Sequence, residues 1–133
     1  MKKDISLPAV EDVAIAIILE DVEGENVWNT YLVNMKDVAL ENVLIVSKGY
    51  GEIKGESRQT TTLRFFFEEI PAGEFVKIEP IMDYTFGLSN EYWLSFYIGS
   101  TIYDKKYIFL PETIHEKNFT KIPIINVEGV MIR

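Results

Sequence analysis

The chain has 133 residues and a formal net charge of −8, with 21 acidic residues against 13 basic ones. This length predicts one domain over residues 1–133, large enough to bury a core without metals or cross-links. The sequence contains no cysteine, which excludes disulfides and thiolate metal sites and is typical of a cytoplasmic protein. Because acidic residues outnumber basic ones and the basic residues are scattered along the chain, we expect no nucleic-acid partner.

The N-terminus gives no sign of a targeting segment. Asp4, Pro8, Glu11 and Asp12 interrupt it, whereas a signal peptide needs an apolar stretch of about 7–15 residues. No run in the chain approaches the ~18 apolar residues of a membrane span. We therefore expect a cytoplasmic protein that has no membrane partner.

The first half of the chain predicts three strands. Apolar residues fill both faces of a strand at 13–19, and the polar segment DVEGEN at 21–26 turns the chain. Strands at 28–33 and 42–47 alternate in the same way. Three glycines and mixed charges at 49–59 then predict a loop.

The next segments continue the β pattern. Residues 60–67 are β-branched and aromatic, which predicts a fourth strand, and a Pro-Ala-Gly turn at 71–73 leads to a fifth at 75–81. In that fifth strand the alternation predicts Val76 and Ile78 on one face, with Lys77 and Glu79 on the other. Pro80 lacks a donor, so the strand should end there or lie at a sheet edge.

The C-terminal third predicts a hairpin, a helical turn and a closing strand. Residues 92–98 and 102–110 flank Gly99-Ser100 as a hairpin. Residues 111–119 can form one or two helical turns, and 122–132 forms the closing strand, with a possible break at Gly129. Seven or eight short strands without a long amphipathic helix predict an all-β antiparallel sandwich or barrel, of which we favour the sandwich.

Two stretches resemble bacterial immunoglobulin-like domains. In YLVNMKDVALENVLIV a strand ends at Asn34, a short turn follows, and Leu40, Asn42 and Val43 open the next strand. EEIPAGEFVKIEPI resembles a later turn and strand of the same domains. The resemblance implies an immunoglobulin-like β-sandwich, although the cysteine pair of antibody domains is absent. It implies nothing specific about function, because such sandwiches host many roles.

The whole sequence also resembles a small family of uncharacterised bacterial proteins, some labelled as a phenylalanyl-tRNA synthetase alpha subunit. A synthetase needs a large catalytic domain with an arginine-bearing ATP motif. LRFFFEE offers only Arg64 and Glu68 on an expected strand, and the chain is too short. The residues therefore do not support that label.

Candidate catalytic and metal sites are few, and we expect no catalytic, cofactor or metal residues. His115 begins an HExxH-like fragment, but Phe119 stands where the second zinc ligand would be. Residues 21–26 carry Asp21, Glu23, Glu25 and Asn26, whose oxygens suit calcium, but a solvated turn between strands explains the same residues and is the interpretation we favour. The spacing lacks the full ligand set of an EF-hand loop. We expect a protein that is not an enzyme.

The surplus of aromatic residues is the strongest functional signal. Core filling along 92–98 takes alternate residues, so Trp93 and Tyr97 should point outward. Together with Leu44, Val46 and Phe66 they form a candidate interaction surface, since exposed apolar sheet faces commonly bind partners. The alternative is that the C-terminal segment covers this face.

These observations leave three hypotheses. The first is a non-catalytic interaction or structural module whose partner is a second copy of the chain or another protein. The second is a sandwich that binds a small ligand or carbohydrate, with Trp93, Tyr97 and Tyr84 as stacking platforms. The third, which has the least support, is an enzyme that uses carboxylates from different strands.

Overall fold

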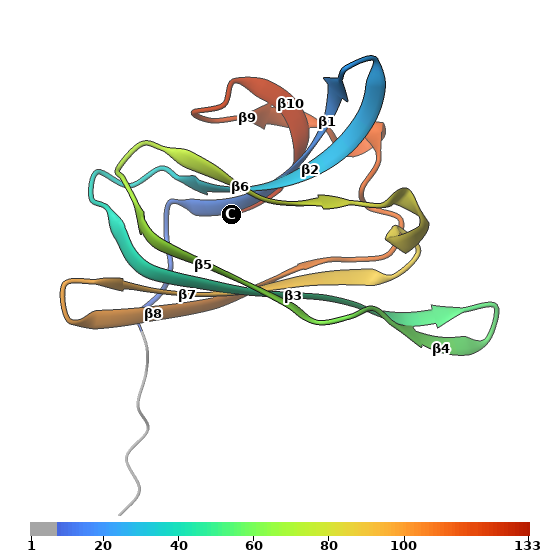
Figure 1. Ribbon diagram of the computed structural model, residues 1–133, viewed down its shortest axis with the longest axis horizontal. Coiled ribbons are helices and arrows are strands. Elements are labelled where there is room, and N and C mark those ends of the chain that lie inside the picture. The colour runs from blue at the N-terminus through green and yellow to red at the C-terminus, as the bar shows by residue number, and fades with distance from the viewer. Residues whose placement is uncertain (1–7) are drawn as a thin grey trace, which may run out of the picture.

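The computed structural model describes residues 8–133 and shows two antiparallel sheets packed face to face (Figure 1). Residues 1–7, which include Asp4 and the expected start of the domain, lie outside the described residues. The all-β sandwich is therefore confirmed, with ten strands where seven or eight were expected. The strands are β1 (Val13–Val22), β2 (Glu25–Asn34), β3 (Leu40–Ile53), β4 (Glu56–Gln59), β5 (Leu63–Ile70), β6 (Phe75–Ile81), β7 (Ser89–Ile98), β8 (Thr101–Phe109), β9 (Thr120–Ile122) and β10 (Val127–Ile132).

The two sheets of the sandwich differ in strand order. The first sheet has the order β6-β2-β1-β10-β9, and the second has the order β4-β3-β7-β8, with β5 paired to the first half of β3. The β9–β10 hairpin extends the first sheet beyond β1.

The core lies between the two sheets. Alternate residues of β7 point inward, whereas Leu40 and Val43 of β3 are both fully buried although they are three residues apart, because β3 is irregular between Glu41 and Leu44. The hydroxyl of Tyr107 donates to the carbonyl of Val13 at 2.7 Å and ties β8 to the start of β1. The largest fully buried side chains are Tyr92, Tyr107, Phe96, Phe109, Ile15, Ile17, Ile18, Leu32, Leu40, Ile45, Leu94 and Ile122.

The connection from β2 to β3 is held by one buried amide. Asn34 Nδ2 donates to the carbonyls of Val38, Ile70 and Pro71, and its Oδ1 accepts from the Lys36 amide. The asparagine therefore joins the turn after β2 to the turn after β5. Asn42 acts through its backbone instead, because its φ of 49° lies in the left-handed region at a bulge in β3.

The expected loop at 49–59 is wrong, because this segment forms a β-hairpin. β3 continues to Ile53 and pairs with β4 across a two-residue turn. Lys54 and Gly55 have φ of 54° and 78°, as a type I′ hairpin turn requires. The three glycines of this segment, which indicated a loop, thus lie in the end of a strand and in a tight turn. The strand expected at 60–67 is shifted accordingly to 63–70.

The expected single closing strand is also wrong in detail. Residues 123–126 separate β9 from β10 as a turn, and Gly129 lies inside β10, paired with Thr120. A Cβ at Gly129 would lie 2.8 Å from the Ile17 carbonyl oxygen. Glycine therefore allows the close approach of β10 to β1 and does not break the strand.

The C-terminal hairpin covers the outer face of the first sheet. Ile122 is fully buried against Ala14 and Ala16 of β1, and Ile125 packs beside them. Small side chains on β1 leave room for this second layer. Both faces of β1 are apolar because other parts of the chain cover both of them.

Two single turns of 3-10 helix complete the fold. Glu116–Asn118 lies inside the segment expected to be helical, and Asp83–Thr85 was not expected. Among residues 8–133, no helix is long and apolar enough to cross a membrane.

Candidate functional site

The five residues proposed from the sequence gather on one face of the second sheet, which we call the outer aromatic face: Leu44, Val46, Phe66, Trp93 and Tyr97. Leu44 lies opposite Phe66 across β3 and β5, and Val46 lies opposite Trp93 across β3 and β7. Phe66 is 62% exposed and Trp93 is 44% exposed. The sheet thus brings together apolar groups from three strands on a surface open to solvent.

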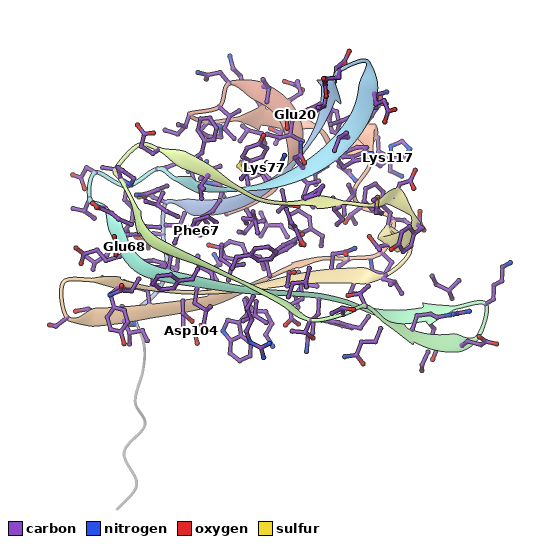
Figure 2. The ribbon with its side chains drawn as sticks, in the orientation of Figure 1. Glu20, Phe67, Glu68, Lys77, Asp104 and Lys117 are labelled. Atoms are coloured by element: carbon purple, nitrogen blue, oxygen red, sulfur yellow. The ribbon has the colours of Figure 1, made fainter. Side chains whose placement is uncertain are left out.

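Polar groups border this face along β8. The indole nitrogen of Trp93 and the hydroxyl of Ser95 both donate to Asp104 Oδ1. Figure 2 shows Asp104 on the outside of the second sheet, whereas Phe67 lies between the two sheets. The Lys106 amine lies 4.8 Å from the centroid of the Trp93 ring, which is cation–π distance. The tryptophan is therefore held in place from two sides.

No described segment covers the outer aromatic face. The C-terminal hairpin was the alternative cover, and it packs on the first sheet instead. Within residues 8–133, the two sheets consequently differ: the first has a second apolar layer on its outside and the second does not.

The three aromatic rings considered for a flat ligand are not brought together. Tyr84 lies in the 3-10 turn Asp83–Thr85 and lines a cavity with Tyr92, on the inner side of β7. Trp93 and Tyr97 point to the opposite side of that strand. In addition, Lys106 occupies one side of the Trp93 ring. The three rings therefore do not form a single stacking surface for a flat ligand.

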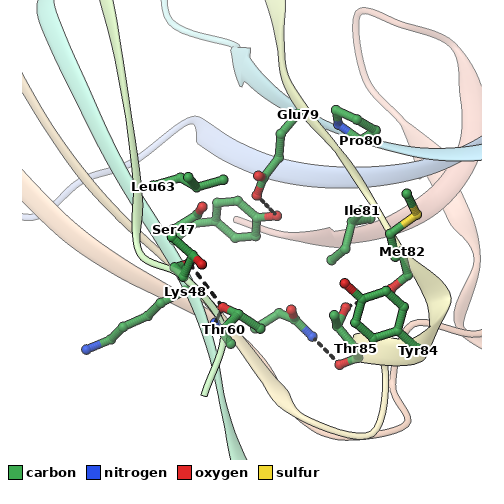
Figure 3. Close-up of a pocket in the computed structure, with 14 residues that line it drawn as sticks. Ser47, Lys48, Thr60, Leu63, Glu79, Pro80, Ile81, Met82, Tyr84 and Thr85 are labelled. Carbon is green, nitrogen blue, oxygen red and sulfur yellow. Dashed lines mark hydrogen bonds between the residues drawn. The ribbon is translucent and has the colours of Figure 1, made fainter. Parts of the chain in front are cut away.

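The structure reveals a second candidate, a cavity of about 230 Å³ at one end of the sandwich (Figure 3). It lies where β3 and the segment before β5 separate from β6. Its walls come from Ser47, Lys48, Gly49, Thr60, Thr61, Leu63, Glu79, Pro80, Ile81, Met82, Tyr84, Thr85, Asn90 and Tyr92.

Glu79 reaches this cavity because of a bulge in β6. Thr30 of β2 pairs with Glu79, and the next residue, Tyr31, pairs with Lys77, so Ile78 is an extra residue on β6. The bulge reverses the alternation, and Glu79 shares the inner face with Thr30. The expectation that Glu79 and Lys77 share a face is wrong for this reason. Regular alternation gave no signal of the bulge.

A chain of hydrogen bonds holds the Glu79 carboxylate. The Tyr92 hydroxyl donates to Glu79 Oε2 at 2.8 Å and lies 3.1 Å from Thr30 Oγ1. Because the single phenolic proton goes to the carboxylate, the Thr30 hydroxyl is the donor to Tyr92. Burial raises the pKa of Glu79, and hydrogen bonds from Tyr92 and Ser47 partly oppose that rise. Burial, followed by the charge of Glu79, raises the pKa of Tyr92.

A second hydrogen-bonded carboxylate, Glu20, lies on the outside of the first sheet. Asn29 Nδ2 and the Tyr31 hydroxyl both donate to Glu20 Oε1, each at 2.7 Å. Burial and the contact with Glu20 raise the pKa of Tyr31 to about 12. Asn29 is 1% exposed, and its Oδ1 has no hydrogen-bond partner among residues 8–133. These contacts brace β1 against β2.

The two metal candidates have structural explanations. His115 Nδ1 accepts from the Lys117 amide at 3.0 Å and caps the turn Glu116–Asn118. Asp21 Oδ1 accepts from the Gly24 amide at 2.9 Å and closes the β1–β2 turn. Among residues 8–133, no group of three acidic, histidine or cysteine side chains could hold a metal ion.

No family model matches this chain, and no curated protein matches it. Functional inference therefore rests on the outer aromatic face and on the cavity at Glu79.

Proposed function

We propose that this protein is a non-catalytic interaction module that self-associates through the outer aromatic face. The observation that carries the proposal is the uncovered apolar surface formed by Leu44, Val46, Phe66, Trp93 and Tyr97. An exposed surface of this kind is costly for a monomer and is typical of binding surfaces. The aromatic content also matches the residue types enriched in interfaces.

The charges on β5 favour a second copy of the chain as the partner. Arg64, Phe66 and Glu68 are exposed and share the outer side of β5. Residues two apart on a strand are separated by roughly 7 Å, so opposite charges flank the phenylalanine. In a dimer with the two outer aromatic faces against each other, the two-fold axis lies between the facing sheets. If this axis runs perpendicular to the strands and passes near Phe66, it places Arg64 opposite Glu68 of the partner subunit. Each isologous contact then occurs twice.

The same axis joins the aromatic rows. Trp93 and Tyr97 lie two rows apart along β7, so the axis places each opposite the other in the partner. The two Asp104 carboxylates would meet near the axis. Each already accepts two hydrogen bonds within its own chain, and Lys106 lies on the same face of β8. Two sheets aligned in this way would pack as the sheets of a sandwich do.

Light scattering coupled to size-exclusion chromatography tests the proposal. We expect a dimer for the native chain and a monomer for the double variant Phe66→Ser, Trp93→Ser. Leu110→Ser is the matched control, since Leu110 is 60% exposed and lies after β8, outside the outer aromatic face. A native chain that is monomeric at micromolar to millimolar concentration contradicts self-association. Equal dissociation of the control would show that the outer aromatic face is not the interface.

A further inference from the structure

The cavity at Glu79 offers hydrogen-bond acceptors to anything that enters it. Three lining hydroxyl groups use their protons inside the protein: Tyr92 donates to Glu79, Thr85 to the Met82 carbonyl at 2.7 Å, and Thr60 to the Thr61 carbonyl at 3.2 Å. The remaining lone pairs of these oxygens, with those of the carboxylate, are acceptors. The complementary ligand is therefore rich in donors.

The charge of the cavity is negative. Glu79 is the only carboxylate among the described residues that line it, and Lys48 is the only basic residue. Figure 3 shows the Lys48 amine pointing away from the cavity, and it lies 5.7 Å from the centroid of the Tyr50 ring. The other titratable groups in the walls are the phenols of Tyr84 and Tyr92. No cation among the described lining residues neutralises Glu79, and a cationic ligand would oppose the rise of its pKa caused by burial.

The mouth and the size of the cavity select for a small alkyl group. Leu63, Met82 and Tyr84 line it and are 45%, 60% and 76% exposed, so apolar surface and an aromatic ring surround the entrance. A volume of about 230 Å³ is below the ~300–1,000 Å³ of drug-sized sites. A metal ion fits less well, because calcium takes about six to eight oxygen ligands, commonly from several carboxylates.

We propose that this cavity binds a primary alkylammonium group, with the ammonium on Glu79 and the alkyl chain against Leu63, Met82 and Tyr84. Three N–H donors of the ammonium match the carboxylate and the hydroxyl oxygens around it. The bulge in β6 serves this site, because without it Glu79 would point to the outside of the first sheet.

Two sources can supply such a group: a free small amine or the side chain of a lysine in a peptide. Titration of the ¹⁵N-labelled protein, followed by amide chemical shifts, distinguishes them. The probes are n-butylamine, the neutral 1-butanol and N-acetyl-lysine methylamide. We expect n-butylamine to bind in the millimolar range and to shift the amides of Gly49, Thr60, Thr85 and Asn90, and 1-butanol to bind at least tenfold more weakly. Whichever of butylamine and the lysine derivative binds more tightly identifies the source.

Substitution of the carboxylate gives the second arm. Glu79→Gln keeps the shape and should weaken n-butylamine at least tenfold, because hydrogen bonds to charged groups are the stronger ones. Glu128→Gln is the matched control: it removes the same charge from an exposed position on β10 and should bind as the native chain does. Equal affinity for butylamine and butanol overturns the proposal, and this comparison needs no variant. Absence of shifts at these four amides, or undiminished binding by Glu79→Gln, also overturns it.

Discussion

Tyr92 and Glu79 join the two sheets through a hydrogen bond of 2.8 Å at the edge of the core. Tyr92 comes from β7 of the second sheet and Glu79 from β6 of the first. The tyrosine ring belongs to the apolar core, whereas its hydroxyl reaches the cavity. One residue therefore contributes both to packing and to the chemistry of the candidate site.

The raised pKa of Glu79 predicts a pH-dependent loss of stability. The folded-state pKa lies above the ordinary value of 4.5, so the folded state binds the proton more tightly than the unfolded state does. The free energy of unfolding contributed by this group should therefore fall as pH rises from 4.5 towards the raised pKa. Glu79→Gln should flatten the dependence over that range. Chemical denaturation at a series of pH values measures it, and Glu128→Gln should keep the native slope.

Tyr92→Phe should destabilise the protein by about 1–3 kcal/mol, because Thr30 and Glu79 each lose a partner near the core. Tyr103→Phe is a suitable control, since the Tyr103 ring stacks on Phe96 with centroids 5.1 Å apart and the phenylalanine keeps that ring. We expect the control to change stability by less than about 0.5 kcal/mol. Equal losses for the two variants in urea denaturation would remove the special role of the Tyr92 hydroxyl.

A charge exchange on β5 tests the geometry of the proposed dimer. Arg64→Glu and Glu68→Arg should each weaken dimerisation roughly tenfold, because each places like charges opposite one another. The double variant should recover most of the native affinity, since the exchanged pair is again complementary. Sedimentation equilibrium gives the dissociation constants. A double variant weaker than either single variant is incompatible with the two-fold arrangement.

Gly129→Ala should destabilise the fold by about 1–3 kcal/mol, because the new Cβ would lie 2.8 Å from the Ile17 carbonyl oxygen. Gly87→Ala provides the comparison. Its nearest contact is 3.4 Å, to a carboxylate oxygen of Glu112, which is the end of a flexible side chain. Thermal unfolding should show a clear drop in Tm for the first variant and a small change for the second. A reversed order would show that β10 can move away from β1 at little cost.

Asn34→Asp should be more destabilising at neutral pH than in acid. The substitution replaces an amide that donates to three carbonyls with a carboxylate whose oxygens repel them. Protonation restores one donor, so the folded state should raise the pKa of this new aspartate and lose stability as pH increases. Circular dichroism melts at several pH values would detect the difference. Asn42→Asp is the control, because Asn42 is exposed; a similar pH dependence there would contradict the explanation.

The residues that alternate regularly made much of the fold predictable. Val43 and Leu44 lie on opposite faces of β3 because strand side chains alternate, and the same rule placed Trp93 on the outside of β7. The turn at Gly99 was recognisable because a glycine between two apolar runs permits positive φ, which is 61° here. These are local properties, and the sequence by itself determines them.

Tertiary structure decided what depends on contacts between distant strands. Glu79 turns inward because β6 pairs with β2 through a bulge, and a regular pattern of residues carries no mark of an inserted one. The C-terminal hairpin packs on Ala14 and Ala16, so no part of residues 8–133 covers the outer aromatic face. Several sheet faces of this protein are apolar, and their hydrophobicity alone does not determine which faces pack against each other. That choice is made by the packing of the whole chain, because burial is non-directional while strand pairing is specific.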